Sequence, residues 1–321
     1  MRVTENTNYG VVRDSITRSK GRIEKLQTQS ATLKKLNTPS DDPIGSAKVL
    51  EIRTDKVNND QFQMNAKLTE SFLNNSEHAL GELGDIMVRA KEIALGQSSG
   101  ASSTEDTRLG VAEEVTQLYQ QAVSVANRRI GERYLFGGYK TQKPPVDAEG
   151  RYQGDDGQIM VEIAKDVFLS MNLTGVEAFN TQPAASIDSR RQTSRAPANE
   201  GERPEQAGPE NVNVFDELQN LRIGLLTGNL DGIRDTLERF DQMHSRLVSM
   251  RAKVGSRVQG LQSTADALER HNITNAQLSQ SIEDADMAQV VSDLAKEESV
   301  FRSALQSSQK LIQPTLMDFL K

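Results

Sequence analysis

The chain lacks cysteine and tryptophan altogether, and only 4% of its 321 residues are aromatic. Without cysteine it can form no disulfide, no thiolate nucleophile and no cysteine-ligated metal site. Hydrophobic residues make up 36% of the chain, which is little for one large globular core. This composition suits long helices packed through narrow seams, because a coiled-coil seam needs only about two apolar positions in seven.

An excess of positive charge and long apolar runs are also missing. The formal net charge is −7, so the chain lacks the basic surface that binds nucleic acid, and we expect no nucleic-acid partner. No run of about 18 apolar residues occurs, so we expect no membrane-spanning helix and no membrane partner. The residues from Met1 to Gly10 are polar and do not resemble a cleaved secretory signal. Export would therefore need a dedicated machinery.

Motifs that carry catalysis or bind cofactors are absent from the sequence. There is no phosphate-binding glycine loop, no G-x-G-x-x-G after a strand, no G-x-S-x-G and no histidine pair at metal-ligand spacing. Asp155 and Asp156 raise the alternative of a calcium loop, but the further acids and the closing glutamate of such a loop do not follow. We therefore predict no catalytic residue, no cofactor-binding residue, no cofactor and no metal ligand.

A seven-residue apolar repeat runs through each end of the chain. At the C-terminal end it comprises Met287, Val291, Leu294, Phe301, Leu305, Ile312, Leu316 and Phe319. At the N-terminal end it comprises Tyr9, Val12, Ile16, Ile23, Leu26 and Leu33. Such stripes are typical of coiled coils, and each needs a partner. The sequence therefore predicts that the two terminal helices pair with each other.

Two further helical segments lie inside the terminal ones. The first terminal helix is expected over about 7–37, before Pro39, and Asp41, Asp42 and Pro43 then cap and start the next helix. The apolar repeat of that next helix takes one phase at Leu50, Val57 and Met64 and a second phase at Leu73, Leu80, Met87 and Ala94. A stricter repeat follows later, at Leu230, Ile233, Leu237, Phe240, Leu247, Val254, Val258, Leu261, Ala265 and Leu268. These repeats predict long antiparallel helices.

The middle of the chain has a different periodicity. Alternating apolar runs at 159–163 and 167–171 are separated by turn residues and predict a few β-strands. Residues 182–213 are rich in proline and polar residues, and we expect a flexible surface excursion there. The predicted fold is mainly α with a small β-rich domain: an elongated rod of long antiparallel helices, a terminal coiled-coil pair, and a β knob at the far tip.

The pattern predicts a division into three domains. Residues 1–40 and 280–321 form a terminal coiled-coil domain, 41–140 and 214–279 a helical rod, and 141–213 a β-rich outer domain. Because isolated helices with narrow stripes are marginal, we expect residues 1 to about 40 and about 280 to 321 to be disordered in the free monomer and to fold together on assembly.

Several motifs resemble those of the bacterial flagellin superfamily. They are the run N-T-P-S-D-D-P at 37–43, the turn Y-L-F-G-G with K-T-x-x-P-P at 134–145, Y-x-G-D-x-G at 152–157, R-x-x-V-G-x-R at 251–257, and the terminal stretch from Ser281 to Leu320. Leu33 stands where relatives tend to have glycine, which should lengthen the first helix. Pro314 lies inside the terminal helix, where a kink is expected.

The resemblance implies a structural adaptor of the extracellular flagellum, at the junction of hook and filament. It implies export by the flagellar type III apparatus, assembly with copies of itself into a ring, and contact with hook-associated protein 1 and flagellin. The terminal stripes would form the subunit interface, and a flagellar export chaperone would bind Met287, Leu294, Phe301 and Leu305. The alternatives are a filament flagellin, a cytoplasmic coiled-coil binding module, or an enzyme housed in the β-rich region.

Overall fold

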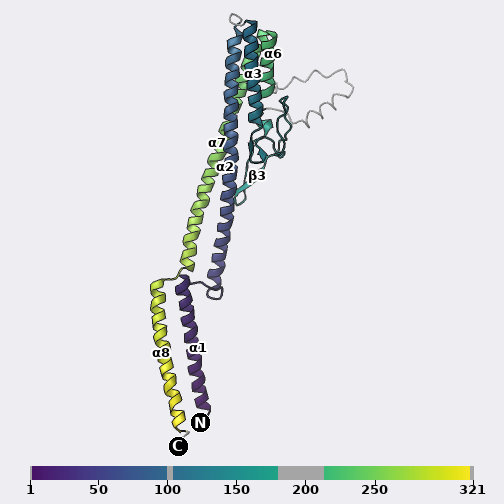
Figure 1. The fold of residues 1–321 in the computed structure, drawn as a ribbon. Helices are drawn as coiled ribbons and strands as arrows, with labels where there is room; N and C mark the ends of the chain where they lie inside the picture. The colour runs from purple at the N-terminus through teal and green to yellow at the C-terminus, as the bar shows by residue number, and fades with distance from the viewer. Residues whose placement is uncertain (1, 100–103, 180–212, 319–321) are drawn as a thin grey trace, which may run out of the picture. The chain divides into compact units, whose positions relative to one another are not determined.

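The computed structural model describes residues 2–99, 104–179 and 213–318, and these are mainly helical (Figure 1). The helices are α1 (Arg2–Thr32), α2 (Pro43–Ser98), α3 (Glu105–Ala126), α4 (Gly175–Phe179), α6 (Val214–Thr227), α7 (Leu230–Glu283) and α8 (Met287–Asp318). Two antiparallel hairpins interrupt them: β1 (Arg129–Ile130) with β2 (Arg133–Tyr134), and β3 (Met160–Ala164) with β4 (Val167–Ser170). The prediction of a mainly α fold with a small β region is confirmed.

The chain forms two compact units. The terminal unit comprises residues 1–59 and 269–321, and the central unit comprises residues 60–268. Helices α2 and α7 each contribute one end to the terminal unit and the rest to the central unit. The division into three domains at residues 40, 140, 213 and 279 stays a prediction. Most of the proline-rich stretch 182–213 lies outside the described residues.

The central unit has one core, shared by its helices and its β region. The largest buried side chains include Phe136, Phe179, Phe215, Phe240, Leu73, Leu80 and Met87. Phe179 packs edge-on against two rings, with centroids 5.0 Å from Phe136 and 5.5 Å from Phe215. Aromatic edge-to-face pairs at this spacing are favourable beyond their buried area. They fasten the β region to α6.

The heptad repeat of α7 is confirmed by burial. Its seam residues Ile233, Phe240, Leu247, Val254 and Leu261 are all buried in the core of the central unit. The second repeat predicted for α2 is buried as well, at Leu73, Leu80, Met87 and Ala94. These helices thus bury the stripes that their sequences predict.

The prediction that the first apolar repeat of α2 forms a buried seam is wrong, because this repeat faces solvent. Leu50, Val57 and Met64 all point to solvent, with more than 60% of each residue exposed. The buried positions of this part of α2 are Val49, Ile52, Asn59 and Ala66. Two stripes compete on this stretch, and the structure buries the one that contains smaller and polar side chains. The outward stripe is left as an apolar surface.

The β3–β4 hairpin lies beside α2. Glu162 pairs with Phe168, and the turn includes Asp166 at a positive φ of 60°. Asn65 of α2 donates a hydrogen bond of 2.9 Å from Nδ2 to the carbonyl oxygen of Glu162. Figure 1 shows β3 alongside α2 rather than beyond a helix end. The expectation of a β knob at a tip is therefore wrong, because the β region packs its buried side chains into the side of the helical core.

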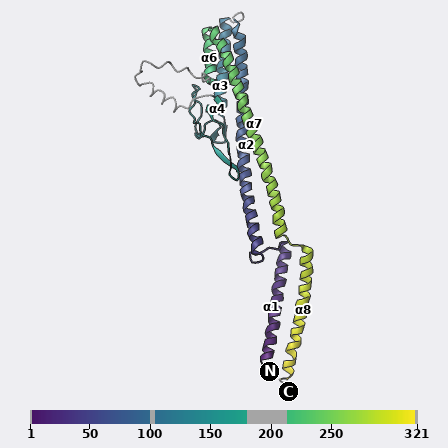
Figure 2. The same cartoon turned by 180° about the vertical axis from the view of Figure 1, so that it is seen from behind.

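In the terminal unit, α1 and α8 pack against each other along their length, as Figures 1 and 2 show. The predicted pairing of the terminal helices is therefore present. Helix α1 ends at Thr32 and not near residue 37, because Leu33 takes a left-handed conformation with φ 59°. A left-handed residue after the last helical turn ends a helix. Helix α8 continues through Pro314 to Asp318.

Candidate functional site

The seam between α1 and α8 is the first candidate surface. On α1 the half-buried or buried side chains include Val12, Ile16, Ser19, Ile23 and Leu26, which follow a spacing of four and three residues. On α8 they include Met287, Val290, Leu294, Glu297, Phe301 and Ala304, with the same alternation. This alternation is the spacing of a coiled-coil seam. Of the predicted interface residues, the structure therefore brings together Val12, Ile16, Ile23, Leu26, Met287, Leu294 and Phe301.

Other predicted interface residues lie elsewhere. Leu33, Val291 and Leu305 are exposed, by 58%, 55% and 40% respectively. Tyr9, Ile312 and Leu316 lie within the terminal helices, where the structure describes the backbone but not their side chains, and Phe319 lies outside the described residues. The apolar stripe of α8 is thus wider than one seam. One edge of it faces α1, and the other edge, at Val291 and Leu305, faces solvent.

The seam also contains residues that the apolar pattern missed. Val290 is 7% exposed and Ser19 only 1%. The Ser19 hydroxyl donates to Glu297 Oε2 at 3.3 Å, and Arg22 Nε lies 3.2 Å from Glu297 Oε1. A signal was present, since Glu283, Val290, Glu297 and Ala304 recur every seven residues. Two of the four are charged, so a search for apolar repeats passes over them.

A hollow beside this polar layer leaves the seam incompletely packed. It has a volume of about 340 Å³ and is lined by Arg22, Lys25, Leu26, Gln29, Asp293, Lys296 and Glu297. All of these lining residues except Leu26 are charged or polar, so polar side chains border the seam at this level.

The ends of α1 and α7 are joined by a short ladder just before α8 begins. Lys34 and Asp284 form an antiparallel bridge. The amide of Lys35 donates to the Glu283 carbonyl at 2.6 Å, and the amide of Ala285 donates to the Leu33 carbonyl at 3.1 Å. This ladder fixes the end of α1 next to the start of α8. We call the residues Leu33–Lys35, Arg53 and Glu283–Ala285 the terminal tie.

A buried carboxylate lies at the centre of the terminal tie. Glu283 is only 9% exposed. Its Oε2 lies 3.2 Å from Lys34 Nζ, and its Oε1 pairs with Arg53 of α2. Each carboxylate oxygen thus meets a separate cation, one following α1 and one on α2. The carboxylate is buried while Lys34 and Arg53 are 41% and 58% exposed, so the cost of removing both cations falls mainly on the carboxylate, which would be left buried without a partner.

The acidic turn between α1 and α2 is structural, as its capping role predicts. Asp42 accepts hydrogen bonds at Oδ1 from the amides of Ile44 and Gly45 and so caps α2. Asp41 instead binds Lys25 of α1, with Nζ 2.9 Å from Oδ1. This hydrogen bond from Lys25, with those from the backbone amides at 38 and 37, lowers the pKa of Asp41 below its ordinary value. The turn therefore joins α1 to α2.

The Y-L-F-G-G and Y-x-G-D-x-G motifs meet in one turn assembly of the central unit. Tyr152 is 3% exposed, and its hydroxyl lies 2.7 Å from the Phe136 carbonyl and 2.8 Å from the Asp155 carbonyl. Burial raises the pKa of Tyr152. Asp155 Oδ1 accepts from the amides of Tyr139 and Gly157. Gly138 has φ 69°, and a Cβ there would meet Asp155. These contacts between the two motifs stabilise the turn assembly.

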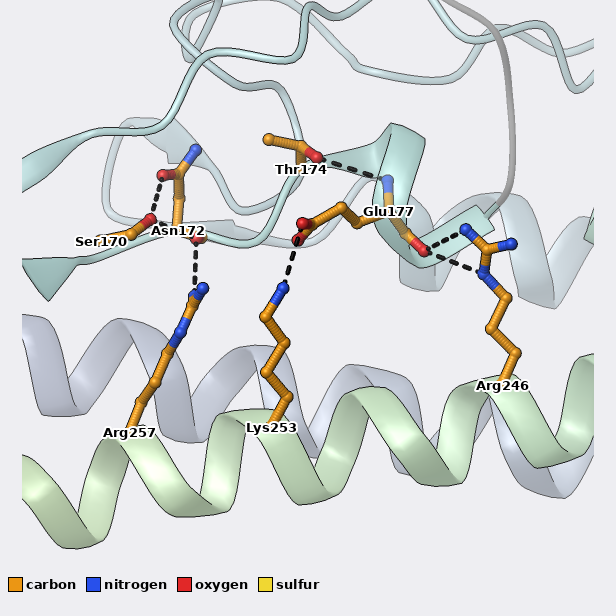
Figure 3. Close-up of polar contacts among 7 residues, drawn as sticks. All are labelled: Ser170, Asn172, Thr174, Glu177, Arg246, Lys253 and Arg257. Carbon is orange, nitrogen blue, oxygen red and sulfur yellow. Dashed lines mark hydrogen bonds and ion pairs between the residues drawn. The ribbon is translucent and has the colours of Figure 1, made fainter.

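Basic side chains of α7 hold the β region, as Figure 3 shows. Arg246 donates to the Glu177 carbonyl at 3.1 and 3.2 Å, and Lys253 Nζ lies 3.1 Å from Glu177 Oε1. Arg257, from the R-x-x-V-G-x-R motif, donates to the Asn172 carbonyl at 3.5 Å. The spacing of these cations places them on one side of α7. Arg251 of the same motif faces α2 and pairs with Glu77 at 2.6 Å.

Buried ionisable chemistry is sparse in the described part of the chain. No group of three or more acidic or histidine side chains lies close enough to hold one metal ion among residues 2–99, 104–179 and 213–318. Burial raises the pKa of Glu217, which is 4% exposed and pairs with Arg239 at 3.1 Å. Glu217 is buried, whereas the Arg239 side chain is 31% exposed. No helix in the described ranges is long and apolar enough to cross a membrane.

Comparison with known proteins gives concordant results. Residues 3–141 match the family described as the bacterial flagellin N-terminal helical region. The chain is 27% identical over 183 residues to flagellar hook-associated protein 3 of Salmonella typhimurium, which covers 56% of this chain and 57% of that protein. It is 28% identical over 142 residues to polar flagellin F of Vibrio parahaemolyticus, covering 44% of this chain and 36% of that protein.

A solved structure extends the likeness in fold. The crystal structure of flagellar hook-associated protein 3 from Legionella pneumophila superposes with a TM-score of 0.57, covering 73% of this chain and 98% of that chain at 16% identity. The sequence match to the Salmonella relative spans little more than half of that relative's length. The chain is thus similar to the bacterial flagellin N-terminal helical region over residues 3–141, is similar in sequence to flagellar hook-associated protein 3 over about half its length, and shares the fold of a solved structure of that protein.

Proposed function

We propose that this protein is a non-enzymatic structural adaptor of the bacterial flagellum, joining the hook to the flagellin filament. The observation that carries the proposal is the paired α1 and α8, with an apolar edge facing solvent, in a chain that matches the flagellin N-terminal region. The similarity to hook-associated protein 3 supports the junction rather than the filament itself. A filament flagellin is the second candidate, supported by the shorter match to a polar flagellin.

The proposed partners follow from this position. The protein assembles with copies of itself into a ring, and the ring meets hook-associated protein 1 on one side and flagellin on the other. Val291 and Leu305 on α8 and the outward stripe of α2 supply apolar surface for these contacts. Exposed apolar side chains in rows are typical of surfaces that another protein covers.

Export precedes assembly in this proposal. The chain leaves the cell through the flagellar type III apparatus, and an export chaperone covers the stripe of α8 on the way. Of the four predicted chaperone contacts, Met287, Leu294 and Phe301 are half-buried in the α1–α8 seam, and Leu305 is exposed. A chaperone that binds all four must therefore replace α1. Its binding and the pairing of α1 with α8 are mutually exclusive.

We further propose that α1 and α8 are only marginally paired in the free monomer and become fully ordered on assembly. The polar layer formed by Ser19, Arg22 and Glu297 supports a weak seam. Ordering on assembly uses burial against neighbouring subunits to offset the lost chain entropy. Limited proteolysis of free and assembled protein measures this. Equal resistance of α1 and α8 in the two states would refute it.

The decisive test of the adaptor function is deletion of the gene in the flagellated source organism. An adaptor predicts hooks without filaments, with full-length flagellin released into the medium, and restoration of filaments by the wild-type gene. A filament flagellin predicts loss of that protein from the filament without release of another. A cytoplasmic binding module predicts intact filaments and retention of the chain inside the cell. Electron microscopy of the cells and immunoblots of the medium separate these outcomes.

A further inference from the structure

We propose that the terminal tie is the point from which α1 and α8 zip together, and that Glu283 is its positioning residue. The tie brings together the end of α1, one side chain of α2, the end of α7 and the start of α8. The backbone ladder of the tie joins Lys34 to Asp284, and its buried carboxylate, Glu283, contacts Lys34 and Arg53. The inference deepens the proposed adaptor function, on which it rests only for its consequence in assembly.

The first step of the argument is the cost of closing a long loop. Lys34 and Glu283 are 249 positions apart in the chain. Bringing such distant residues together costs entropy once, and contacts that follow next to the closed point cost far less. With the tie formed, the first seam contacts, between Leu26 on α1 and Val290 or Leu294 on α8, become local contacts. Without the tie, they would have to form between two free helices.

The second step is the quality of the seam along its length. Close to the tie, Val290 is buried, and the seam continues through Leu26 and Ile23. Further along, the polar pair of Ser19 with Glu297 interrupts the apolar contacts. Helix nucleation is unfavourable in isolation, so ordering spreads most easily from a turn already held in place. The pair therefore orders from the tie toward both chain ends.

The third step identifies Glu283 within the tie. Its carboxylate is the one group in the described tie that contacts both Lys34, beyond α1, and Arg53, on α2. Its own carbonyl accepts the amide of Lys35 at 2.6 Å. Replacing the carboxylate by an amide keeps its size but removes the charge from both contacts. Lys34 and Arg53, which are 41% and 58% exposed, then lose their charged partner, whose own side chain is 12% exposed.

Hydrogen exchange on the free, full-length chain tests the inference. We expect the amides of Lys35 and Ala285 to be the most protected of the terminal unit's tie and seam, with protection falling along α1 and α8 toward the chain ends. E283Q should lower their protection about ten- to a hundredfold, the range for loss of hydrogen bonds to a charged group, and should also deprotect α1 and α8. E298Q is the matched control, because Glu298 forms only an exposed pair with Arg302.

A second variant tests the direction of zipping. F301A removes a seam side chain far from the tie, so it should deprotect the seam between Phe301 and the chain ends and leave Lys35 and Ala285 as in the wild type. A triple variant, E283K with K34E and R53E, should restore protection if charge pairing at the tie is what matters. Protection of α3 and α6 in the central unit reports that each variant is folded.

The inference is overturned if E283Q retains wild-type protection, if F301A deprotects Lys35 and Ala285 as strongly as the distal seam, or if the charge-reversed triple variant behaves like E283Q. The adaptor function is measured separately, by the presence of the chain in isolated flagella. A chain that assembles into flagella but shows no gradient from the tie refutes the zipping order alone. A chain that shows the gradient but never enters flagella refutes the adaptor function alone.

Discussion

Replacing Leu33 by glycine should stabilise the terminal unit. Leu33 has a φ of 59° and is 58% exposed, so its side chain contributes little burial while its backbone is strained. An L-residue in the left-handed region costs roughly 1–2 kcal/mol, which glycine does not incur. Glycine adds unfolded-state entropy worth about 0.4–1 kcal/mol. The difference leaves a net stabilisation of about 0 to 1.6 kcal/mol for L33G.

The assay for this prediction is local. Exchange of the Lys35 and Ala285 amides reports opening of the ladder that includes the Leu33 carbonyl. L33A keeps the strained backbone and should change little, whereas L33V adds a β-branched side chain and should lose stability. The expected order of protection is therefore glycine above leucine and alanine, and valine last. A glycine variant that is less protected than the alanine variant would refute the reasoning.

Further predictions concern the core, a buried hydroxyl and acid stability. L247A truncates a side chain that is 2% exposed and should lower the free energy of unfolding, measured by heat or urea, by about 2–5 kcal/mol. V248A truncates the neighbouring side chain, which is 49% exposed, and should lower it by less than about 0.5 kcal/mol. Equal losses would contradict the assignment of Leu247 to the buried face of α7. Y152F leaves the Asp155 carbonyl without the Tyr152 hydroxyl, while the Phe136 carbonyl still accepts from the Gly175 amide, and should cost about 1–3 kcal/mol by the same assay; no loss would contradict these hydrogen bonds. The pKa of Asp41 is lowered, so its pairing with Lys25 stabilises the fold above the ordinary aspartate pKa, and this stabilisation is lost as pH falls below about 4. D41N should flatten this acid dependence of the terminal unit's stability. An unchanged dependence of stability on pH, measured by circular dichroism, would contradict the prediction.

The sequence predicts helices better than it predicts which way they face. The repeat of α7 is buried as expected because its apolar residues leave one plausible seam, for example at Ile233, Phe240 and Val254. On α2 the residues Leu50 and Val57 form an equally regular stripe, yet they face solvent. A stripe that another protein covers has the same period as a stripe buried within the chain. Only the three-dimensional packing distinguishes the two.

The candidate site is harder to predict for a similar reason. Met287 can be followed in a seam by Val290 or by Val291, since coiled coils alternate steps of three and four. Apolarity cannot choose between two valines, and the structure buries Val290. The role of Glu283 depends on cations at Lys34 and Arg53 that are distant in the chain. Local patterns contain no information on such a contact.

The polar layer of the seam has a consequence for alignment. A repeat of seven residues allows α8 to slide along α1 by one full period while keeping apolar side chains in contact. Such a slip would bring Val290 or Ala304 opposite Ser19 and would move Glu297 away from both Ser19 and Arg22. A half-buried carboxylate without those partners is costly. The Ser19–Glu297 pair therefore favours a single alignment of α1 with α8, and that alignment fixes the positions of the exposed Val291 and Leu305 along the pair.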